Sequence, residues 1–161
     1  MKAFMDKDFM LQSPTAQHLY HDYAADMPIC DYHCHIPPRE IYENRRFENI
    51  AQVWLGGRNP DGSYFGDHYK WRVMRSNGVP EEYITGDKPD RERFQKFAEA
   101  LPMAIGNPMY HWTNLELHVF FGYDGVLNGD TAEEVWNLCN DKLQHDPKLT
   151  VRGLIEQSNV A

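Results

Sequence analysis

Residues 28–38 read Pro-Ile-Cys-Asp-Tyr-His-Cys-His-Ile-Pro-Pro, and the rest of the chain is organised around this stretch. Its central part is compatible with a short β-strand near residues 29–35, where side chains two residues apart point to the same face. His33 and His35 would therefore share a face. The two prolines that close the stretch cannot continue a hydrogen-bonded ladder, so the strand is expected to end directly after His35.

Two imidazoles side by side at a strand end can bind one divalent metal, with Zn–N distances of about 2.0–2.1 Å. The C-terminal ends of strands are also where α/β barrels and open α/β sheets place their chemistry. The spacing alone fits a metal site and a strand end with nothing bound about equally well, because His-x-His is a short pattern. Asp31 has the same parity as the histidines. It is either a carboxylate that orients one of them or a buried residue at the strand start.

Composition restricts the class of protein. A chain of 161 residues fits one ordinary domain with a core of its own. The net charge of −8, with no basic face to offset it, argues against a nucleic-acid partner. No stretch approaches the roughly 20 apolar residues of a membrane span, and the N-terminus does not read as a signal peptide. Three cysteines do not describe a disulfide framework, so a reducing cytoplasm is the expected compartment.

Helical patterns dominate the remaining sequence. Ser13, Asp67 and Asp130 are predicted N-caps, and a Gly- and Asn-Pro-rich stretch over 56–66 is predicted to be a surface loop. His18 and His21, three residues apart on the first helix, are interpreted as polar positions beside packed tyrosines rather than as metal ligands. Helices are expected over residues 13–24, 38–44, 49–55, 68–77, 80–86, 87–101, 108–120, 131–145 and 150–157.

One predicted strand accompanies many predicted helices. This combination is unexpected, because a lone strand has no neighbouring strand to pair with its backbone groups. Either the stretch is an irregular segment among helices, or its sheet lies outside this chain. The sequence closes with a helix, a short turn and an apolar residue, which is how a helix precedes a strand in an α/β protein. We therefore expect this sequence to be the N-terminal part of a longer α/β protein.

Four separated motifs then carry a resemblance. They are Leu-Tyr-His-Asp-Tyr-Ala at 19–24, Asp-Tyr-His-Cys-His-Ile-Pro-Pro at 31–38, Gly-Asp-His-Tyr-Lys-Trp-Arg at 66–72 and Ile-Gly-Asn-Pro-Met-Tyr-His-Trp-Thr-Asn-Leu-Glu-Leu at 105–117. In this order and combination, the chain resembles uronate isomerase, the glucuronate/galacturonate isomerase branch of the amidohydrolase superfamily.

The resemblance implies an α/β fold of the TIM-barrel, metal-dependent hydrolase-like kind. Residues 1–161 would be the N-terminal third of that barrel, incomplete as a barrel and mainly α-helical in themselves. They would hold the first barrel strand near 29–35 and a helical insertion at about 37–145. The stretch 56–66 looks longer than the family's usual link at this point, and it is expected to alter only the rim of the site.

The resemblance also implies a reaction, the aldose–ketose isomerisation of uronic acids in hexuronate catabolism: D-glucuronate to D-fructuronate, and D-galacturonate to D-tagaturonate. His33 and His35 would be metal ligands for a divalent cation, with zinc the expected metal. His68 and Tyr69 would be catalytic, with Tyr69 acting at the substrate oxygens and His68 positioning the substrate or that tyrosine. From the residues alone, these two would be read as part of a capped surface helix with aromatic rings packed inward.

Other residues are placed outside the site. Arg72 and Arg75 are interpreted as solvated arginines, and His111, Trp112 and Glu116 as core packing. The family's third metal ligand, an aspartate, and its substrate-binding arginines would lie far downstream. The isolated chain is therefore expected to be inactive.

Two alternative functions remain open at this stage: a non-enzymatic helical interaction domain, and a metal-dependent hydrolase of the same superfamily. The Asp-His-Tyr-Lys-Trp motif argues against the hydrolase. The expected partner is a small-molecule uronate, without nucleic acid or membrane. An uncovered barrel edge would also favour self-association into a homo-oligomer.

Overall fold

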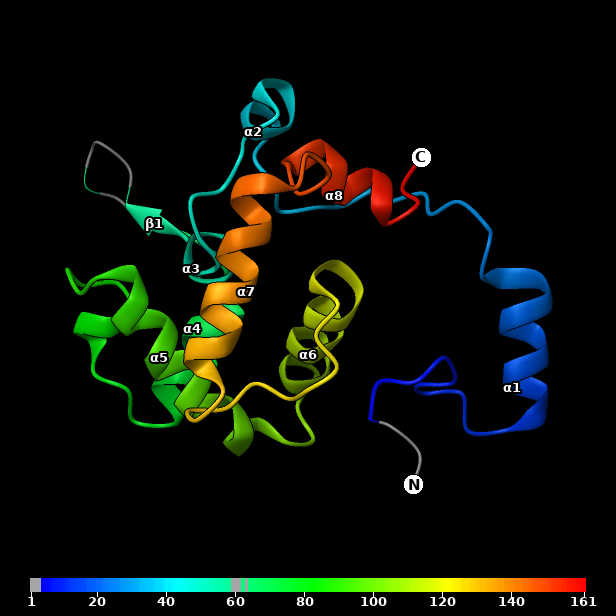
Figure 1. The fold of residues 1–161 in the computed structure, drawn as a ribbon, viewed down its shortest axis with the longest axis horizontal. Coiled ribbons are helices and arrows are strands. Elements are labelled where there is room, and N and C mark those ends of the chain that lie inside the picture. Colours follow the sequence, from blue (N-terminus) through cyan, green and yellow to red (C-terminus); the bar gives the residue numbers. More distant parts are fainter. Residues whose placement is uncertain (1–3, 59–61, 63) are drawn as a thin grey trace. The chain divides into compact units, whose positions relative to one another are not determined.

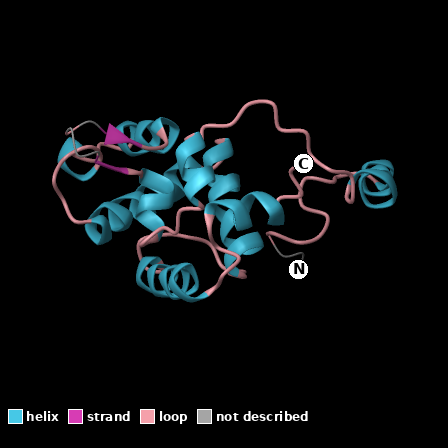
Figure 2. Cartoon of the chain, turned by 90° about the horizontal axis from the view of Figure 1, so that it is seen from above, coloured by secondary structure: helices cyan, strands magenta, loops and turns pink. Residues whose placement is uncertain are grey.

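The computed structural model describes residues 4–58, 62 and 64–161. The described chain is mainly helical, as predicted, with two very short strands in view (Figure 2). No helix in this part of the chain is both long enough and apolar enough to cross a membrane. The elements, labelled in Figure 1, are α1 (Pro14–Leu19), η1 (Tyr20–Ala24), α2 (Pro38–Glu43), α3 (Ile50–Leu55), β1 (Gly57–Arg58), β2 (Tyr64–Phe65), α4 (His68–Ser76), η2 (Glu81–Tyr83), α5 (Asp90–Ala100), η3 (Leu101–Ala104), α6 (Pro108–Phe121), α7 (Ala132–His145) and α8 (Val151–Gln157).

The chain divides into two compact units. The unit formed by residues 46–146, the central unit, is built around α5, which packs against α3, α4 and α7 (Figure 1). Phe94 and Phe97 on α5 are fully buried, and both rings lie about 6 Å from the ring of Trp54 on α3, at 6.0 and 5.9 Å between centroids. Aromatic pairs at such distances add to the apolar burial. The helix predicted over residues 87–101 thus buries an aromatic face in the interior of this unit.

Side-chain caps explain where α3, α4 and α6 of the central unit begin, and of these only the Asp67 cap was predicted. The Asn49 side chain accepts a hydrogen bond from the Gln52 amide, and the Asn107 side chain accepts one from the Met109 amide. Asp67 caps α4 in the predicted way. These bonds satisfy amide groups that the first turn of a helix leaves without a partner.

Two helix starts differ from the prediction. Asp130 does not cap α7, because the Asn128 side chain instead accepts hydrogen bonds from the amides of both Asp130 and Thr131, and the helix begins at Ala132. The helix predicted from residue 87 begins only at Asp90, since Pro89 keeps an extended backbone and disfavours helical dihedrals in the residue before it.

The predicted loop over 56–66 contains an unpredicted hairpin. β1 and β2 pair antiparallel, with Gly57 opposite Phe65. Residues 59–61 and 63 of that predicted loop lie outside the described residues. At the base of the hairpin, Gly56 has a φ of 68°, and a Cβ atom there would lie 1.8 Å from the Phe65 carbonyl oxygen. Only glycine tolerates this close approach of two backbones.

The second unit, residues 4–45 with 147–161, is termed the terminal unit. Ser13 caps α1 as predicted, accepting a hydrogen bond from the Ala16 amide, but neither α1 nor η1 has a buried residue. Tyr20 and Tyr23, predicted to pack, are exposed. The helical spacing was read correctly, but nothing within the described residues buries this face.

The stretch predicted as a strand, residues 29–35, is exposed and forms a single bridge rather than a ladder within the described chain. Ile29 pairs in parallel with Val160: its amide donates to the Asn159 carbonyl at 2.8 Å, and its own carbonyl accepts from the Ala161 amide at 3.0 Å. A parallel bridge is the smallest unit of the parallel pairing that a barrel would require.

Candidate functional site

The structure brings together the nitrogen atoms of the predicted histidine ligands. Nε2 of His33 lies 3.0 Å from Nε2 of His35, with ring centroids 5.0 Å apart, and both side chains are exposed. The two rings thus meet, as the parity of the sequence predicts. The Asp31 carboxylate accepts a hydrogen bond from the His33 backbone amide at 3.2 Å.

The spacing of the two nitrogens fits the binding of one metal ion. Two ligands at 2.0–2.1 Å from a tetrahedral ion lie about 3.3 Å apart, close to the observed 3.0 Å. Neutral imidazole is a preferred ligand for zinc. No group of three or more His, Cys, Asp or Glu side chains that could hold a metal ion occurs among the described residues.

The other histidines of the terminal unit are engaged with carboxylates. Nδ1 of His18 lies 2.5 Å from the Asp22 carboxylate, and Nε2 of His21 lies 2.8 Å from the Asp8 carboxylate. These ion pairs agree with the interpretation that both are polar surface positions.

The predicted catalytic pair opens α4 in the central unit. The rings of His68 and Tyr69 lie 4.2 Å apart between centroids, and Tyr69 is 49% exposed. The Asp67 carboxylate accepts a hydrogen bond from the Tyr69 amide at 2.8 Å, which fixes the backbone that carries both rings. The Tyr69 ring therefore does not pack inward, contrary to what a reading of the residues as an ordinary amphipathic helix would predict.

The remaining members of the Asp-His-Tyr-Lys-Trp motif point inward. Lys70 is only 5% exposed, and its ammonium group lies 3.1 Å from the Asp67 carboxylate. The Trp71 indole donates a hydrogen bond to the Leu55 carbonyl at 2.9 Å. The motif thus combines two accessible rings with three anchored side chains, an arrangement suited to holding functional groups on a rigid support.

A second layer of contacts lies behind this turn, and the sequence did not reveal it. The Lys70 ammonium lies 5.9 Å from the ring of Trp54, whose indole N–H donates to the Glu116 carboxylate at 2.6 Å. Glu116, interpreted from the sequence as core packing, thus contributes the acceptor of a hydrogen bond. Trp112, predicted to be in the core, is exposed. The helical spacing of α6 could not show which of its faces would be covered.

The two arginines of α4 behave differently. Arg75 forms a pair with Glu81, with its Nη2 2.5 Å and its Nε 2.8 Å from the carboxylate oxygens. That guanidinium lowers the pKa of Glu81 to about 2, mainly through the hydrogen bond. The guanidinium of Arg72, in contrast, lies 5.6 Å from the centre of the Tyr69 ring. Arg72 therefore places a positive charge beside the predicted catalytic tyrosine, which sequence reasoning had not used.

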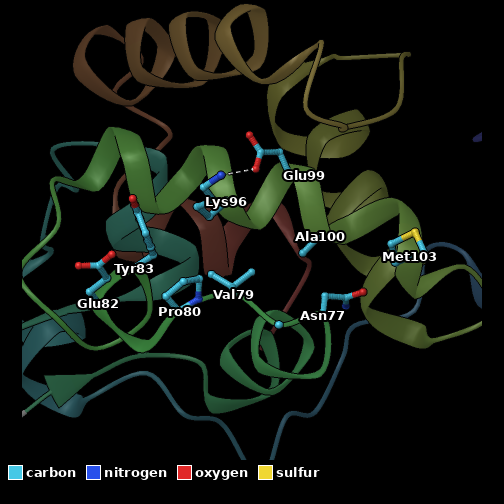
Figure 3. A pocket seen from close by; sticks show the side chains of 10 residues that line it. Asn77, Val79, Pro80, Glu82, Tyr83, Lys96, Glu99, Ala100 and Met103 are labelled. Carbon is cyan, nitrogen blue, oxygen red and sulfur yellow. Dashed lines mark hydrogen bonds and ion pairs between the residues drawn. The ribbon is translucent and has the colours of Figure 1, made fainter.

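A surface pocket of about 580 Å³ also lies in the central unit, but none of the predicted site residues lines it (Figure 3). Its charged groups are already paired: the Lys96 ammonium lies 2.7 Å from the Glu99 carboxylate, and this hydrogen bond raises the pKa of Lys96 and lowers that of Glu99. The candidate functional residues are therefore two separate pairs, His33 with His35 in the terminal unit and His68 with Tyr69 in the central unit. Each pair is assembled within its own unit.

Comparison with known proteins identifies the class. The family described as glucuronate isomerase matches residues 1–161. A uronate isomerase of Lachnospira eligens is 71% identical over 160 residues, and one of Bacillus subtilis is 52% identical over 160 residues. In both cases the match covers 99% of this chain and 32% of the relative. The crystal structure of uronate isomerase from Thermotoga maritima aligns with a TM-score of 0.85 and 34% identity, covering 99% of this chain and 32% of that one.

The fold and the matches over nearly the whole chain thus define a segment of a protein of the uronate isomerase class. The chain belongs to the uronate isomerase family, also called glucuronate isomerase. It spans about a third of the length of the curated relatives that it matches.

Proposed function

We propose that residues 1–161 contribute part of the active site of a uronate isomerase, which interconverts the aldose and ketose forms of uronic acids. The substrates would be D-glucuronate, giving D-fructuronate, and D-galacturonate, giving D-tagaturonate. The observation that carries the proposal is the first turn of α4. There Asp67, Lys70 and Trp71 are held inward, and the ring of Tyr69 remains accessible.

The reaction needs groups that manage protons on the two substrate oxygens. A base removes the C2 proton, the C2–H electron pair forms the C1–C2 double bond, and the carbonyl π pair moves to O1. The resulting enediol anion is protonated at C1, and the O2 hydroxyl proton is transferred to O1. Tyr69 can donate a hydrogen bond to O1 as its charge develops and can relay the O2 proton, while His68 positions the substrate or the Tyr69 phenol.

His33 and His35 are the proposed ligands of a divalent metal, with zinc the expected ion, because their Nε2 atoms converge within 3.0 Å. Such a metal supplies polarisation and orientation of substrate oxygens when bound. We expect dialysed full-length protein to retain zinc. The double substitution of His33 and His35 by Ala should lower the metal content, while His18→Ala, a histidine of the same unit paired with Asp22, should not. Retention of zinc by the double variant would contradict this assignment.

The proposal also holds that the isolated chain does not turn over substrate. It provides two histidine ligands and spans about a third of its relatives, so the groups that would complete the metal and carboxylate sites must come from elsewhere. Its free cysteines, two of them exposed, suit the reducing cytoplasm proposed as its compartment.

The test compares the 161-residue chain with a hybrid enzyme, in which this chain replaces the matching third of the Lachnospira eligens uronate isomerase. We expect the hybrid to isomerise D-glucuronate and D-galacturonate, and the 161-residue chain to isomerise neither. Tyr69→Phe should lower kcat of the hybrid by about 10²–10⁴-fold, the range for loss of an acid–base group. Tyr42→Phe, at another exposed tyrosine, is the matched control. A silent hybrid would refute the isomerase proposal, and turnover by the chain alone would refute its predicted inactivity.

A further inference from the structure

Arg93, on the central helix α5, is a buried charged residue that neither the motifs nor the proposed reaction uses. Its side chain is only 4% exposed. Nη1 donates to the Gly56 carbonyl at 3.1 Å, and Nη2 donates to the Leu55 carbonyl at 3.2 Å and to the Ile84 carbonyl at 3.0 Å. A buried guanidinium that makes several hydrogen bonds holds its partners in a fixed geometry.

The partners of Arg93 lie where α3 ends and the hairpin begins. The last carbonyl groups of a helix have no partner within the helix, and they attract positive charge. Here the fork of Arg93 satisfies two successive carbonyls, those of Leu55 and Gly56. One carboxylate, that of Asp90, balances the charge, with its oxygen 3.0 Å from Nη1 of Arg93.

The Leu55 carbonyl also joins Arg93 to the candidate site. The same oxygen accepts a hydrogen bond from the indole of Trp71, the last residue of the Asp-His-Tyr-Lys-Trp motif. A single acceptor is therefore shared by a residue of α5 and a residue of the α4 turn. Displacing this oxygen would remove one of the anchors of that turn.

A backbone contact provides a second connection. Gly66 immediately precedes the Asp67 cap of α4, and a Cβ atom on Gly66 would lie 2.4 Å from the Leu55 carbonyl oxygen. Gly66, which leads from β2 into α4, thus lies in close contact with the Leu55 carbonyl that accepts a hydrogen bond from Arg93. The position of this carbonyl determines where the turn carrying His68 and Tyr69 begins.

We propose that Arg93 is a positioning residue for this isomerase, acting through the Leu55 and Gly56 carbonyls to hold Tyr69 and His68 in their productive places. The inference rests on the proposed function, because it assigns a role within that same site. Lysine cannot replace Arg93, since one ammonium lacks the planar fork that reaches separate acceptors simultaneously. Arg91, two residues earlier on α5, lies over the Trp136 ring and donates to Gln95, so it provides a matched control.

The experiment is a double-mutant cycle in the hybrid enzyme, with rates expressed per folded protein as measured by near-ultraviolet circular dichroism. Arg93→Lys should lower kcat/KM by about 10²-fold, mostly in kcat, which is the usual result of a small misplacement of catalytic groups. In the Tyr69→Phe background, the same substitution should cost less than about tenfold, because one of the two groups it positions is already missing and only His68 remains to be displaced. Arg91→Lys should leave kcat/KM unchanged in both backgrounds.

A local measurement accompanies the cycle. Hydrogen exchange of amides at 64–71 should accelerate in Arg93→Lys, while exchange in α7 (132–145) stays as in the parent. If Arg93→Lys does not fold, Arg93→Gln takes its place, because it retains a neutral donor at this position and the Asp90 carboxylate, 30% exposed, stays partly solvated.

The outcomes separate the two proposals. A parent hybrid without isomerase activity refutes the proposed function and, with it, the role of Arg93. If the parent hybrid is active and Arg93→Lys lowers kcat/KM by the same factor with and without the Tyr69 hydroxyl, the positioning role is refuted and the proposed function is not. An equal increase of exchange in α7 and in the turn refutes the positioning role as well, because Arg93 would then be a general stabilising residue.

Discussion

The central unit and the terminal unit both consist mainly of helices and loops, but they differ in what is buried. In the central unit, α3, α4, α5, α6 and α7 each contribute buried side chains to the interior. In the terminal unit, four of the described residues are buried: Met5, Leu149, Val151 and Gly153. α1, η1 and α2 have no buried residue. Helical pattern and buried core are therefore separate properties of this chain.

The two units also differ in the contacts that hold them together. Caps and individual hydrogen bonds define the terminal unit, such as Arg152, whose Nε donates to the Ile41 carbonyl at 2.7 Å, and the Ile29–Val160 bridge. Hydrogen bonds each contribute only about 1 kcal/mol net, whereas burial of one large apolar side chain contributes about 1.5–3 kcal/mol. The predicted metal ligands thus lie on the less well-packed unit, and the predicted catalytic pair lies on the well-packed one.

The largest expected difference between the two units is in the reactivity of their cysteines. Cys30 and Cys34 in the terminal unit are exposed, whereas Cys139 on α7 is buried, and burial raises the pKa of its thiol to about 12. At pH 8 the exposed pair should react with iodoacetamide more than about 10³-fold faster, because the thiolate is the nucleophile. Mass spectrometry of the labelled peptides measures the ratio. Comparable rates would mean that α7 is not packed in solution.

The raised pKa of the Cys139 thiol also has a consequence for stability. The folded state favours the neutral thiol, so its contribution is fully present below the ordinary pKa of about 8.5 and is lost as the pH rises toward 12.

The second prediction concerns apolar burial. Phe97→Ala, at a fully buried position of α5, should lower the free energy of unfolding by about 3–5 kcal/mol. Tyr23→Ala, at an exposed position of the terminal unit, should change it by less than about 0.5 kcal/mol. Urea titrations followed by circular dichroism measure both. A similar loss in the two variants would show that the terminal unit has a core of its own.

The third prediction tests the importance of caps in the terminal unit. Ser13→Ala removes the hydrogen bond from the Ala16 amide to the serine hydroxyl and should destabilise α1 by about 1 kcal/mol. Hydrogen exchange of residues 14–24 should therefore accelerate, while residues 90–100 of α5 keep their protection. An acceleration that spread to α5 would indicate that both units unfold together.

The smallest expected effect concerns a surface ion pair of the central unit. Glu81, whose side chain is 54% exposed, bonds to Arg75, and this lowers its pKa to about 2. A lowered pKa in the folded state gives stability that is present above the ordinary pKa and is lost as the pH falls from about 4.5 toward 2. At neutral pH, Glu81→Gln should cost less than about 1 kcal/mol.

The control for this pair is Glu82→Gln, because the Glu82 carboxylate lies farther, 3.7 Å, from its partner Lys88. Thermal unfolding at pH 7 and pH 3 compares the variants. A loss of stability on acidification that is identical in Glu81→Gln and in the parent would show that this pair contributes nothing.

Several features of the site follow from sequence alone because they depend on local geometry. The parity of His33 and His35 fixes their common side, and an aspartate before a helix predicts the Asp67 cap. The predicted Asp130 cap was wrong although it also depends on local geometry, because the Asn128 side chain accepts the hydrogen bonds of the Asp130 and Thr131 amides. The motif pattern also pointed correctly to the family.

By itself, the sequence determined the helical character of the chain, most helix boundaries and the identity of the motif residues, because caps, prolines and apolar periodicity act over a few residues. The tertiary structure alone decided that Tyr69 faces outward while Lys70 and Trp71 are anchored, and that Arg93 reaches the end of α3 across 37 and 38 residues of sequence. It also decided that Tyr20 and Tyr23 of the first helical segment meet neighbouring histidine rings but stay exposed. Burial and long-range hydrogen bonds depend on which surfaces meet in space, and no spacing in the sequence specifies that.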